Sequence, residues 1–174
     1  MMEDYEILLL VGAIMVIGIG TILIFTASIR QKQKKGIADL LQHSEILNCR
    51  EYHANGVYQY AFETKDKAFF LKVVMLSSKY ELIITNPKQW CINDDPKAWK
   101  RSVRPKTIDG VPEFIKLKHP DKPTIRIALI VPGCHNITVY LNESDVALVN
   151  HAKPVHGVYF VQMHEFSNFL STFL

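Results

Sequence analysis

Four basic residues recur at intervals of three and four positions in the segment DDPKAWKRSVRPK, which spans residues 94–106. At this spacing they share one face of a helix, for which Asp94, Asp95 and Pro96 offer an N-cap and a first-turn proline. Clustered cations of this kind contact phosphate groups of nucleic acids or anionic lipids, with a salt-dependent affinity. The alternative is a solvated helix face with Trp99 buried behind it. The basic residues are Lys97, Lys100, Arg101 and Arg104, with Lys106 just beyond them.

Most other catalytic motifs are absent from the sequence. The chain has no HExxH metalloprotease pair, no GxSxG elbow, no phosphate-binding GxxxxGK[ST] loop and no CxxC pair. Cys134 and His135 are adjacent, but neighbours along a strand point to opposite faces and do not share a proton. The seven histidines are expected to be exposed or to be satisfied core residues. No metal or cofactor is therefore predicted from these motifs.

A long apolar segment precedes the rest of the chain. Residues 7–29 carry no charge, and as a helix they extend about 35 Å at ~1.5 Å per residue. This length exceeds the bilayer core of roughly 30 Å, and the acidic start does not fit a signal peptide. We therefore expect a transmembrane helix over 7–29, preceded by an extracytoplasmic tail over 1–6 and followed by a basic juxtamembrane segment over 30–36.

The flanks of this segment predict its orientation. Three acidic residues precede it and four basic residues follow it, and basic flanks remain on the cytoplasmic side. The N-terminus is thus expected outside a cell membrane crossed once, with a cytoplasmic domain over 37–174. Three widely spaced cysteines agree with reduced thiols in that compartment. The basic residues placed at the membrane surface, against anionic lipid headgroups, are Arg30, Lys32, Lys34 and Lys35.

The charge of the predicted domain is close to neutral. The chain has 20 basic and 17 acidic residues; four and three of these lie within the first 35 positions, which leaves 16 and 14. A net charge of this size does not produce the broad positive field of a dedicated nucleic-acid-binding domain.

The pattern of the remaining chain predicts an α/β fold. A short helix is expected over 36–47, strands follow in an antiparallel meander, and the unbroken apolar run at 124–133 indicates a strand covered on both faces. Residues 142–150 offer a turn of helix that Asn142 or Ser144 could cap, and residues 164–174 a terminal helix with one apolar face. Further strands are expected at 49–53, 56–63, 68–76, 80–85, 90–92, 137–141 and 157–162. The order predicts an α/β sandwich around one mixed sheet.

The segment QYAFETKDKAFFLKVV at 59–74, with KYELIITNPKQWCI at 79–92, resembles the nuclease-related (NERD) branch of the restriction-endonuclease-like PD-(D/E)xK fold. The closing segments from Ile125 to Leu170 are similar to the last strands and helix of that branch. The resemblance implies a Mg²⁺ site at the hairpin and hydrolysis of nucleic acid. Here, however, Gln59, Lys72 and Val74 occupy the positions of the metal-binding acid, the glutamate and the lysine. The resemblance is therefore to a form degenerate at its catalytic positions.

These substitutions decide the predicted function. An amide, an ammonium and an alkyl group do not form the oxygen-ligand site that Mg²⁺ requires. We expect a membrane-anchored binding or interaction module that is nuclease-like but inactive, with anionic lipid, nucleic acid or another membrane protein as partner. The alternative is a divergent, membrane-tethered, metal-dependent nuclease that uses relocated acids, namely Glu63, Asp66 or Glu81. The oligomeric state is not predicted.

Overall fold

The computed structural model of the chain describes residues 4–42, 46–52, 56–93, 106–142 and 145–174, and for several residues of the first helix it describes the backbone alone. The chain forms two compact units, of which the first ends at Leu40 and the second is Leu41–Leu174.

The first unit is one helix, α1, which runs from Asp4 to Leu40 without a break. It continues through the basic residues at 30–35 and includes the start of the separate helix that was expected over 36–47. Among the residues that the structure describes, no helix combines the length and apolar composition needed to cross a membrane. This finding contradicts the predicted membrane-spanning segment over 7–29, on which the predicted single-pass topology depended.

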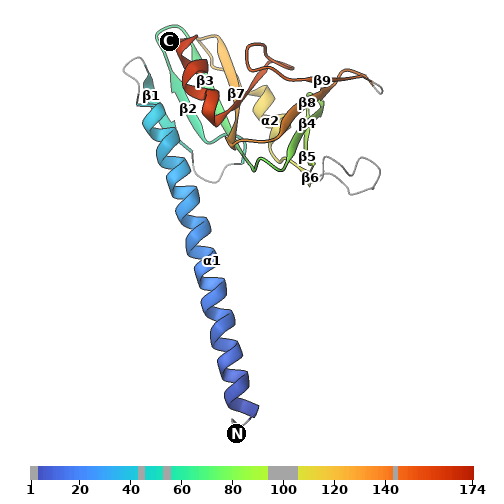
Figure 1. Cartoon of the computed structure of the whole chain (residues 1–174). Helices are drawn as coiled ribbons and strands as arrows, with labels where there is room; N and C mark the ends of the chain where they lie inside the picture. Colours follow the sequence, from blue (N-terminus) through green and yellow to red (C-terminus); the bar gives the residue numbers. More distant parts are fainter. Residues whose placement is uncertain (1–3, 43–45, 53–55, 94–105, 143–144) are drawn as a thin grey trace. The chain divides into compact units, whose positions relative to one another are not determined.

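The described residues of the second unit form two five-stranded sheets rather than the one mixed sheet that was predicted (Figure 1). The first sheet has the order β1-β2-β3-β7-β10, with β3, β7 and β10 parallel and the other pairs antiparallel. Its strands are β1 (Leu47–Glu51), β2 (Tyr60–Glu63), β3 (Ala68–Leu76), β7 (Thr124–Pro132) and β10 (Val158–Gln162).

The second sheet has the order β6-β5-β4-β8-β9. Only β4 and β8 are parallel, and the remaining neighbours are antiparallel. Its strands are β4 (Glu81–Asn86), β5 (Gln89–Asn93), β6 (Lys106–Thr107), β8 (Asn136–Tyr140) and β9 (Val146–Leu148).

Two chain segments run side by side and parallel through both sheets. They form β3 and β7 in the first sheet and continue as β4 and β8 in the second. β3 and β7 pair from Ala68↔Thr124 to Leu76↔Pro132, and β4 and β8 resume the pairing at Glu81↔Asn136. Four residues, 77–80, separate β3 from β4, whereas three, 133–135, separate β7 from β8. The backbone N–H of His135 donates to the carbonyl of Tyr80 at 2.7 Å across this junction. Where one mixed sheet was predicted, the structure has a bend. At this bend the parallel pairing of β3 with β7 ends, and the same two chain segments continue as β4 and β8 in the second sheet.

The main hydrophobic core lies between the two sheets. Alternate residues of β3, β7 and β10 face it, because side chains of a strand point in turn to opposite sides. Helix α2 (Val111–Lys116) also contributes: the ring of Phe114 packs edge-on against Trp90, with centroids 6.1 Å apart. The core members from the strands include Val74, Leu76, Ala128, Ile130, Val158 and Phe160 of the first sheet and Leu82, Ile84, Ile137 and Val139 of the second.

The opposite face of the first sheet is covered by the C-terminal helix. A short 3-10 turn at Met163–Glu165 leads into α3 (Phe166–Ser171), whose Phe169 packs against Tyr159 of β10 at 5.2 Å between centroids. Residues from Ile127 to Val131 of β7 are at most 1% exposed. The predictions of a doubly covered strand at 124–133 and of an apolar-faced terminal helix are confirmed.

Three other segments were not predicted correctly or lie outside the described residues. The helix expected over 97–103 lies outside the described residues. The helical turn expected at 142–150 is wrong, because Val146–Leu148 form β9, the edge strand of the second sheet. Helix α2 was not predicted, since it lies in the proline-interrupted region from 105 to 123.

Candidate functional site

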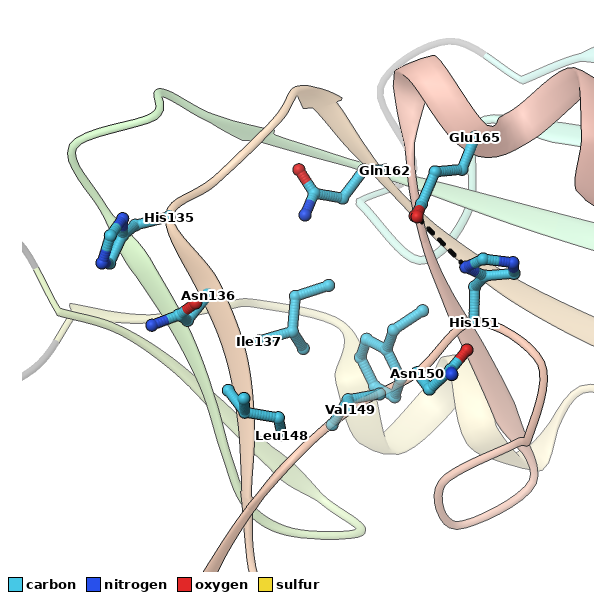
Figure 2. A pocket seen from close by; sticks show the side chains of 10 residues that line it. His135, Asn136, Ile137, Leu148, Val149, Asn150, His151, Gln162 and Glu165 are labelled. Carbon is cyan, nitrogen blue, oxygen red and sulfur yellow. Dashed lines mark ion pairs between the residues drawn. The ribbon is translucent and has the colours of Figure 1, made fainter.

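A cavity of about 470 Å³ opens on the second unit where the two sheets diverge (Figure 2). Three segments line it: residues 135–137 at the start of β8, residues 148–151 after β9, and the end of β10 with the turn that follows, represented by Phe160, Gln162 and Glu165. No sequence pattern joins these segments.

The position of the cavity follows from the strand topology. The parallel strands β7 and β10 end at Pro132 and Gln162, at the same edge of the first sheet. In sheets with parallel strands, ligands commonly bind in the crevice outside the carboxyl ends of the strands. The bend at 133–135 turns the chain away from this edge and leaves the space open.

Polar side chains converge on one side of the cavity. His151 and Glu165 form an ion pair when the imidazole is protonated, with Nδ1 and Oε1 3.2 Å apart, and both side chains are about one-third exposed. Gln162 projects from the end of β10 between this pair and the segment that carries His135 (Figure 2). Its Oε1 accepts a hydrogen bond from the backbone N–H of Cys134 at 3.3 Å.

Gly133 allows Gln162 to occupy this position. A Cβ at residue 133 would lie 2.9 Å from Oε1 of Gln162, which is closer than side-chain carbons normally approach. Glycine at the end of β7 thus leaves room for the amide at the end of β10.

Cys134 lies beside the cavity but is not suited to nucleophilic chemistry. Its side chain is buried, and its Sγ donates to the carbonyl of Asn136 at 3.3 Å. Burial raises the pKa of the Cys134 thiol to about 11, so that the reactive thiolate is scarce near neutral pH.

The hairpin that carries the nuclease resemblance forms as predicted, between β2 and β3. Lys72 points into the interior and is 2% exposed. Its amine donates to the carbonyl of Gly56, and to that of Val57 at 3.2 Å. Burial lowers the pKa of Lys72, and the charges of Asp109 and Glu113 oppose that shift.

The other two substituted positions also have structural roles. Gln59 lies just before β2, and its Oε1 accepts the backbone N–H of Val73 at 2.6 Å, so that the amide bonds to the adjacent strand. Val74 is 4% exposed and belongs to the core between the sheets. Gln59, Lys72 and Val74 thus stabilise the fold locally.

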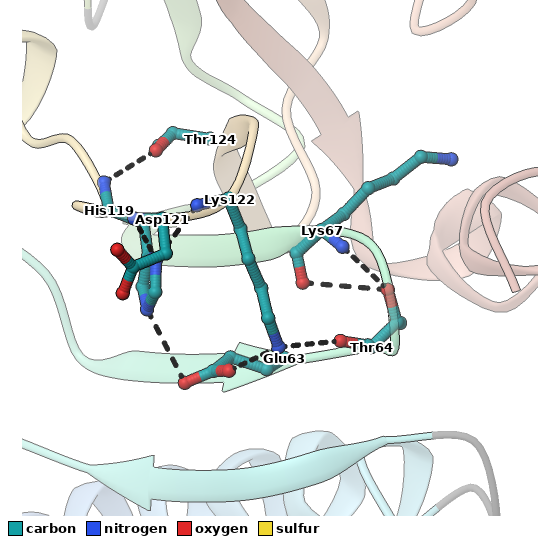
Figure 3. A network of polar contacts seen from close by, with 7 residues as sticks. All are labelled: Glu63, Thr64, Lys67, His119, Asp121, Lys122 and Thr124. Atoms are coloured by element: carbon teal, nitrogen blue, oxygen red, sulfur yellow. Dashed lines mark hydrogen bonds and ion pairs between the residues drawn. The ribbon is translucent and has the colours of Figure 1, made fainter.

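Glu63 is engaged in a network at the turn end of the hairpin (Figure 3). Its Oε2 accepts a hydrogen bond from the amine of Lys122 at 2.6 Å, and that amine also donates to the carbonyl of Thr64 at 3.0 Å. The bond from Lys122 holds the pKa of Glu63 below its ordinary value of 4.5. The carboxylate therefore stays ionised, and one of its oxygens is already hydrogen-bonded to Lys122.

His119 closes the same network. Its Nδ1 accepts the backbone N–H groups of Asp121 and Lys122, both at 3.1 Å. A nitrogen that accepts carries no hydrogen, so the neutral ring has its hydrogen on Nε2, which lies 3.7 Å from Oε1 of Glu63. The network joins the β2–β3 turn to the loop before β7.

The remaining acids proposed for a relocated site do not join Glu63. Asp66 is exposed in the β2–β3 turn, three residues from Glu63. Glu81 begins β4 in the other sheet, where it accepts hydrogen bonds from Thr138 at 3.0 Å and Asn93 at 3.4 Å. Within the described ranges, no group of three or more His, Cys, Asp or Glu side chains is arranged to hold a metal ion.

The predicted basic surfaces are only partly described. Lys97, Lys100, Arg101 and Arg104 lie outside the described residues, and Lys106 is exposed in β6. Lys32, Lys34 and Lys35 are exposed on α1, and the side chain of Arg30 is not described.

The cavity is the site that sequence reasoning missed. His135 was considered only as the neighbour of Cys134 and His151 only among the seven histidines, and Gln162 and Glu165 were read as the end of a strand and the start of a helix. The available signal was two buried apolar runs ending at Gly133 and Gln162, since neighbouring parallel strands place their ends at one edge. Comparison of the chain with protein-family models, with curated proteins and with solved structures finds no match.

Proposed function

We propose that Leu41–Leu174 is a binding or interaction module without catalytic activity, a nuclease-like domain whose catalytic positions have taken structural roles. The observation that carries the proposal is the placement of Lys72. Its amine is directed to two backbone carbonyls in the interior, at the position where the resemblance would require a metal-binding carboxylate.

The surroundings of Lys72 oppose metal binding in two ways. An ammonium group repels a divalent cation, and Mg²⁺ needs hard oxygen ligands in near-octahedral geometry. The neighbouring Gln59 already uses its oxygen for the N–H of Val73. Val74 supplies only methyl groups to the core. No attacking water is activated by such a set.

The relocated acids support the same proposal. Glu63 is bonded to Lys122, and Glu81 lies in a different sheet and is bonded to Thr138. Recruiting either for a metal would require these bonds to break. A bonded carboxylate in each of two sheets is the arrangement expected of structural residues.

The proposal is tested on the full chain with metal and with nucleic acid. A site of micromolar affinity in millimolar Mg²⁺ or Mn²⁺ would stabilise the folded state by about 4 kcal/mol, which a melting curve detects. We expect no such shift and no cleavage of single- or double-stranded DNA or RNA. Lys72→Glu is expected to create neither metal binding nor cleavage, because the amide of Gln59 and the alkyl group of Val74 still cannot complete a metal site.

The opposite outcome identifies the enzyme. A metal-dependent rise in melting temperature, with cleavage that disappears in Glu63→Ala, Asp66→Ala or Glu81→Ala, would contradict the proposal. The matched control is Glu113→Ala, which removes an exposed acid from α2. That control should leave any genuine activity intact.

A further inference from the structure

The cavity at the bend between the sheets is lined by an apolar wall and a polar wall, and the polar side chains of His135 and Asn136 lie next to the apolar wall (Figure 2). Ile137 and Val149 supply the apolar wall, and Leu148 extends it at the mouth, where its side chain is 71% exposed. Gln162, Glu165 and His151 form the polar wall opposite (Figure 2). A ligand that fits has one apolar face and one hydrogen-bonding edge.

The charges of the cavity select against ions. Its described lining contains no lysine and no arginine, so a phosphate or carboxylate group would meet the carboxylate of Glu165 without a fixed positive charge to offset it. A cationic ligand would have to compete with His151 for the same carboxylate, whose Oε1 lies 3.2 Å from Nδ1. A neutral ligand meets neither cost.

The polar side chains of the cavity supply both hydrogen-bond donors and acceptors. The Oε1 of Gln162 is taken by the N–H of Cys134, which leaves the two hydrogens of its Nε2 for a ligand. Asn150 is oriented similarly, since its Oδ1 accepts the N–H of Ala152 at 2.9 Å. The carboxylate of Glu165 adds acceptor capacity beside these amide donors.

Hydroxyl groups match such a set, because each one donates and accepts. A sugar ring carries hydroxyls around its edge and apolar C–H groups on its face. A planar heterocycle, by contrast, has two apolar faces and would leave one of them against the polar wall. The volume of about 470 Å³ lies within the range of small-molecule sites, roughly 300–1,000 Å³.

We propose that this cavity binds a small, neutral, polyhydroxylated ligand of the monosaccharide class. The apolar face of the ring packs on Ile137 and Val149, and its hydroxyls bond to Gln162 and Glu165. His151 positions the Glu165 carboxylate. The inference rests on the proposed function, because it names what the binding module takes.

The test uses the full chain and a panel of glucose, galactose, mannose, N-acetylglucosamine and ribose. Saturation-transfer NMR at tens of millimolar sugar reports binding, and titration of the best member gives its Kd. Inorganic phosphate and uracil are measured in parallel as an anion and as a planar heterocycle. We expect at least one sugar to bind, and phosphate and uracil to fail to compete with it.

Three variants locate the binding. Gln162→Ala removes one ligand partner, and Glu165→Gln replaces a charged acceptor with a neutral amide. Each should weaken binding about tenfold. Leu148→Trp fills the mouth of the cavity from an exposed position, so it leaves the core intact and should also abolish binding. The matched controls are Glu113→Gln and Gln89→Ala, which lie outside the cavity and should retain the parent Kd.

The results that overturn the proposal are distinct from those that overturn the proposed function. A panel without binding, sugar binding that persists in Leu148→Trp, or equal competition by phosphate or uracil would each eliminate the sugar site. None of these outcomes creates metal-dependent cleavage, so the non-catalytic module would stand without this ligand. Cleavage of nucleic acid would instead contradict the module itself.

Discussion

Gly110, at the start of α2, lies against the carbonyl oxygen of Gly56, so closely that a Cβ on Gly110 would be 2.5 Å from that oxygen. The same carbonyl accepts a hydrogen bond from the amine of Lys72. The segment before β2 is thus held between the buried lysine of β3 and Gly110, the N-cap residue of α2. This contact connects the β2–β3 hairpin to α2, which contributes to the core.

Gly110→Ala is therefore expected to destabilise the domain strongly. Gly110 has φ 70°, and an L-residue in the left-handed region costs about 1–2 kcal/mol. The clash with the Gly56 carbonyl adds to this cost because it involves backbone, so a total loss above about 2 kcal/mol is expected. Urea unfolding followed by circular dichroism measures the change.

Gly56→Ala is the matched control for that measurement. Gly56 has a similar φ of 63°, but among the described residues no atom lies within 4 Å of the point that a Cβ would occupy there. Only the backbone cost of about 1–2 kcal/mol applies at this position. Equal losses in the two variants would show that the close approach of Gly110 to Gly56 does not contribute.

Lys72→Met is expected to change how stability depends on pH. Burial lowers the pKa of Lys72 in the folded protein below its ordinary value of 10.5. Between the lowered pKa and 10.5 the unfolded chain binds a proton that the folded protein does not, so the stability conferred by Lys72 rises with pH across this window. The unfolding free energy of the parent, minus that of Lys72→Met, should therefore increase as pH rises toward 10.5.

The control for Lys72→Met is Lys116→Met, which replaces an exposed lysine at the end of α2. Its stability should follow that of the parent at every pH. A parent and a Lys72→Met variant with parallel pH profiles would contradict the burial of a charged amine at this position.

The strands of the first sheet were predictable from the sequence, whereas the division into two sheets was not. The runs at 68–76 and 124–133 are apolar over a strand length, and β3 and β7 form there with nearly the expected bounds. The bend depends on residues 77–80 and 133–135, whose composition is that of an ordinary turn. Only the register across the two parallel strands reveals that they leave one sheet and enter the other together.

The error at 142–150 has a local physical cause. Asn142 was read as a possible helix cap, and its Oδ1 does accept a backbone N–H, that of Asp145 at 2.8 Å. The same hydrogen bond serves in turns as well as in helix caps. The edge position of the following strand, Val146–Leu148, depends on its pairing with β8 and leaves no separate signal in the sequence.

Lys122→Ala is expected to raise the pKa of Glu63 toward its ordinary value of 4.5. The hydrogen bond from Lys122 is the largest cause of the lowered pKa. Because the pKa is lowered in the folded state, the contribution of Glu63 to stability is present above pH 4.5 and is lost as pH falls through the lowered pKa. Carboxyl-detected NMR titration follows Glu63 directly.

The control is Lys79→Ala, which removes an exposed lysine from the β3–β4 connection and should leave the Glu63 titration unchanged. If Lys122→Ala also left it unchanged, the ion pair in Figure 3 would not be the origin of the shift.

The three cysteines are expected to react with thiol reagents at very different rates. Cys49 is exposed in β1, whereas Cys91 and Cys134 are buried. Burial raises the pKa of Cys134 to about 11, so at pH 8 only about one thiol in a thousand is ionised. Iodoacetamide should therefore add one group to the native protein, at Cys49, and three groups in urea, as measured by mass spectrometry.

Cys49→Ser is the control that assigns the native reaction, because it should remove the single fast modification and leave a protein that reacts only when it unfolds. Protection of Cys134 in the native state matters for the site, since its Sγ bonds to the carbonyl of Asn136, a residue that lines the cavity. A thiol that stays protonated there does not attack a bound ligand. Fast labelling of Cys134 in the folded protein would contradict its burial and would place a reactive nucleophile beside Gln162, which a purely binding role for the cavity does not need.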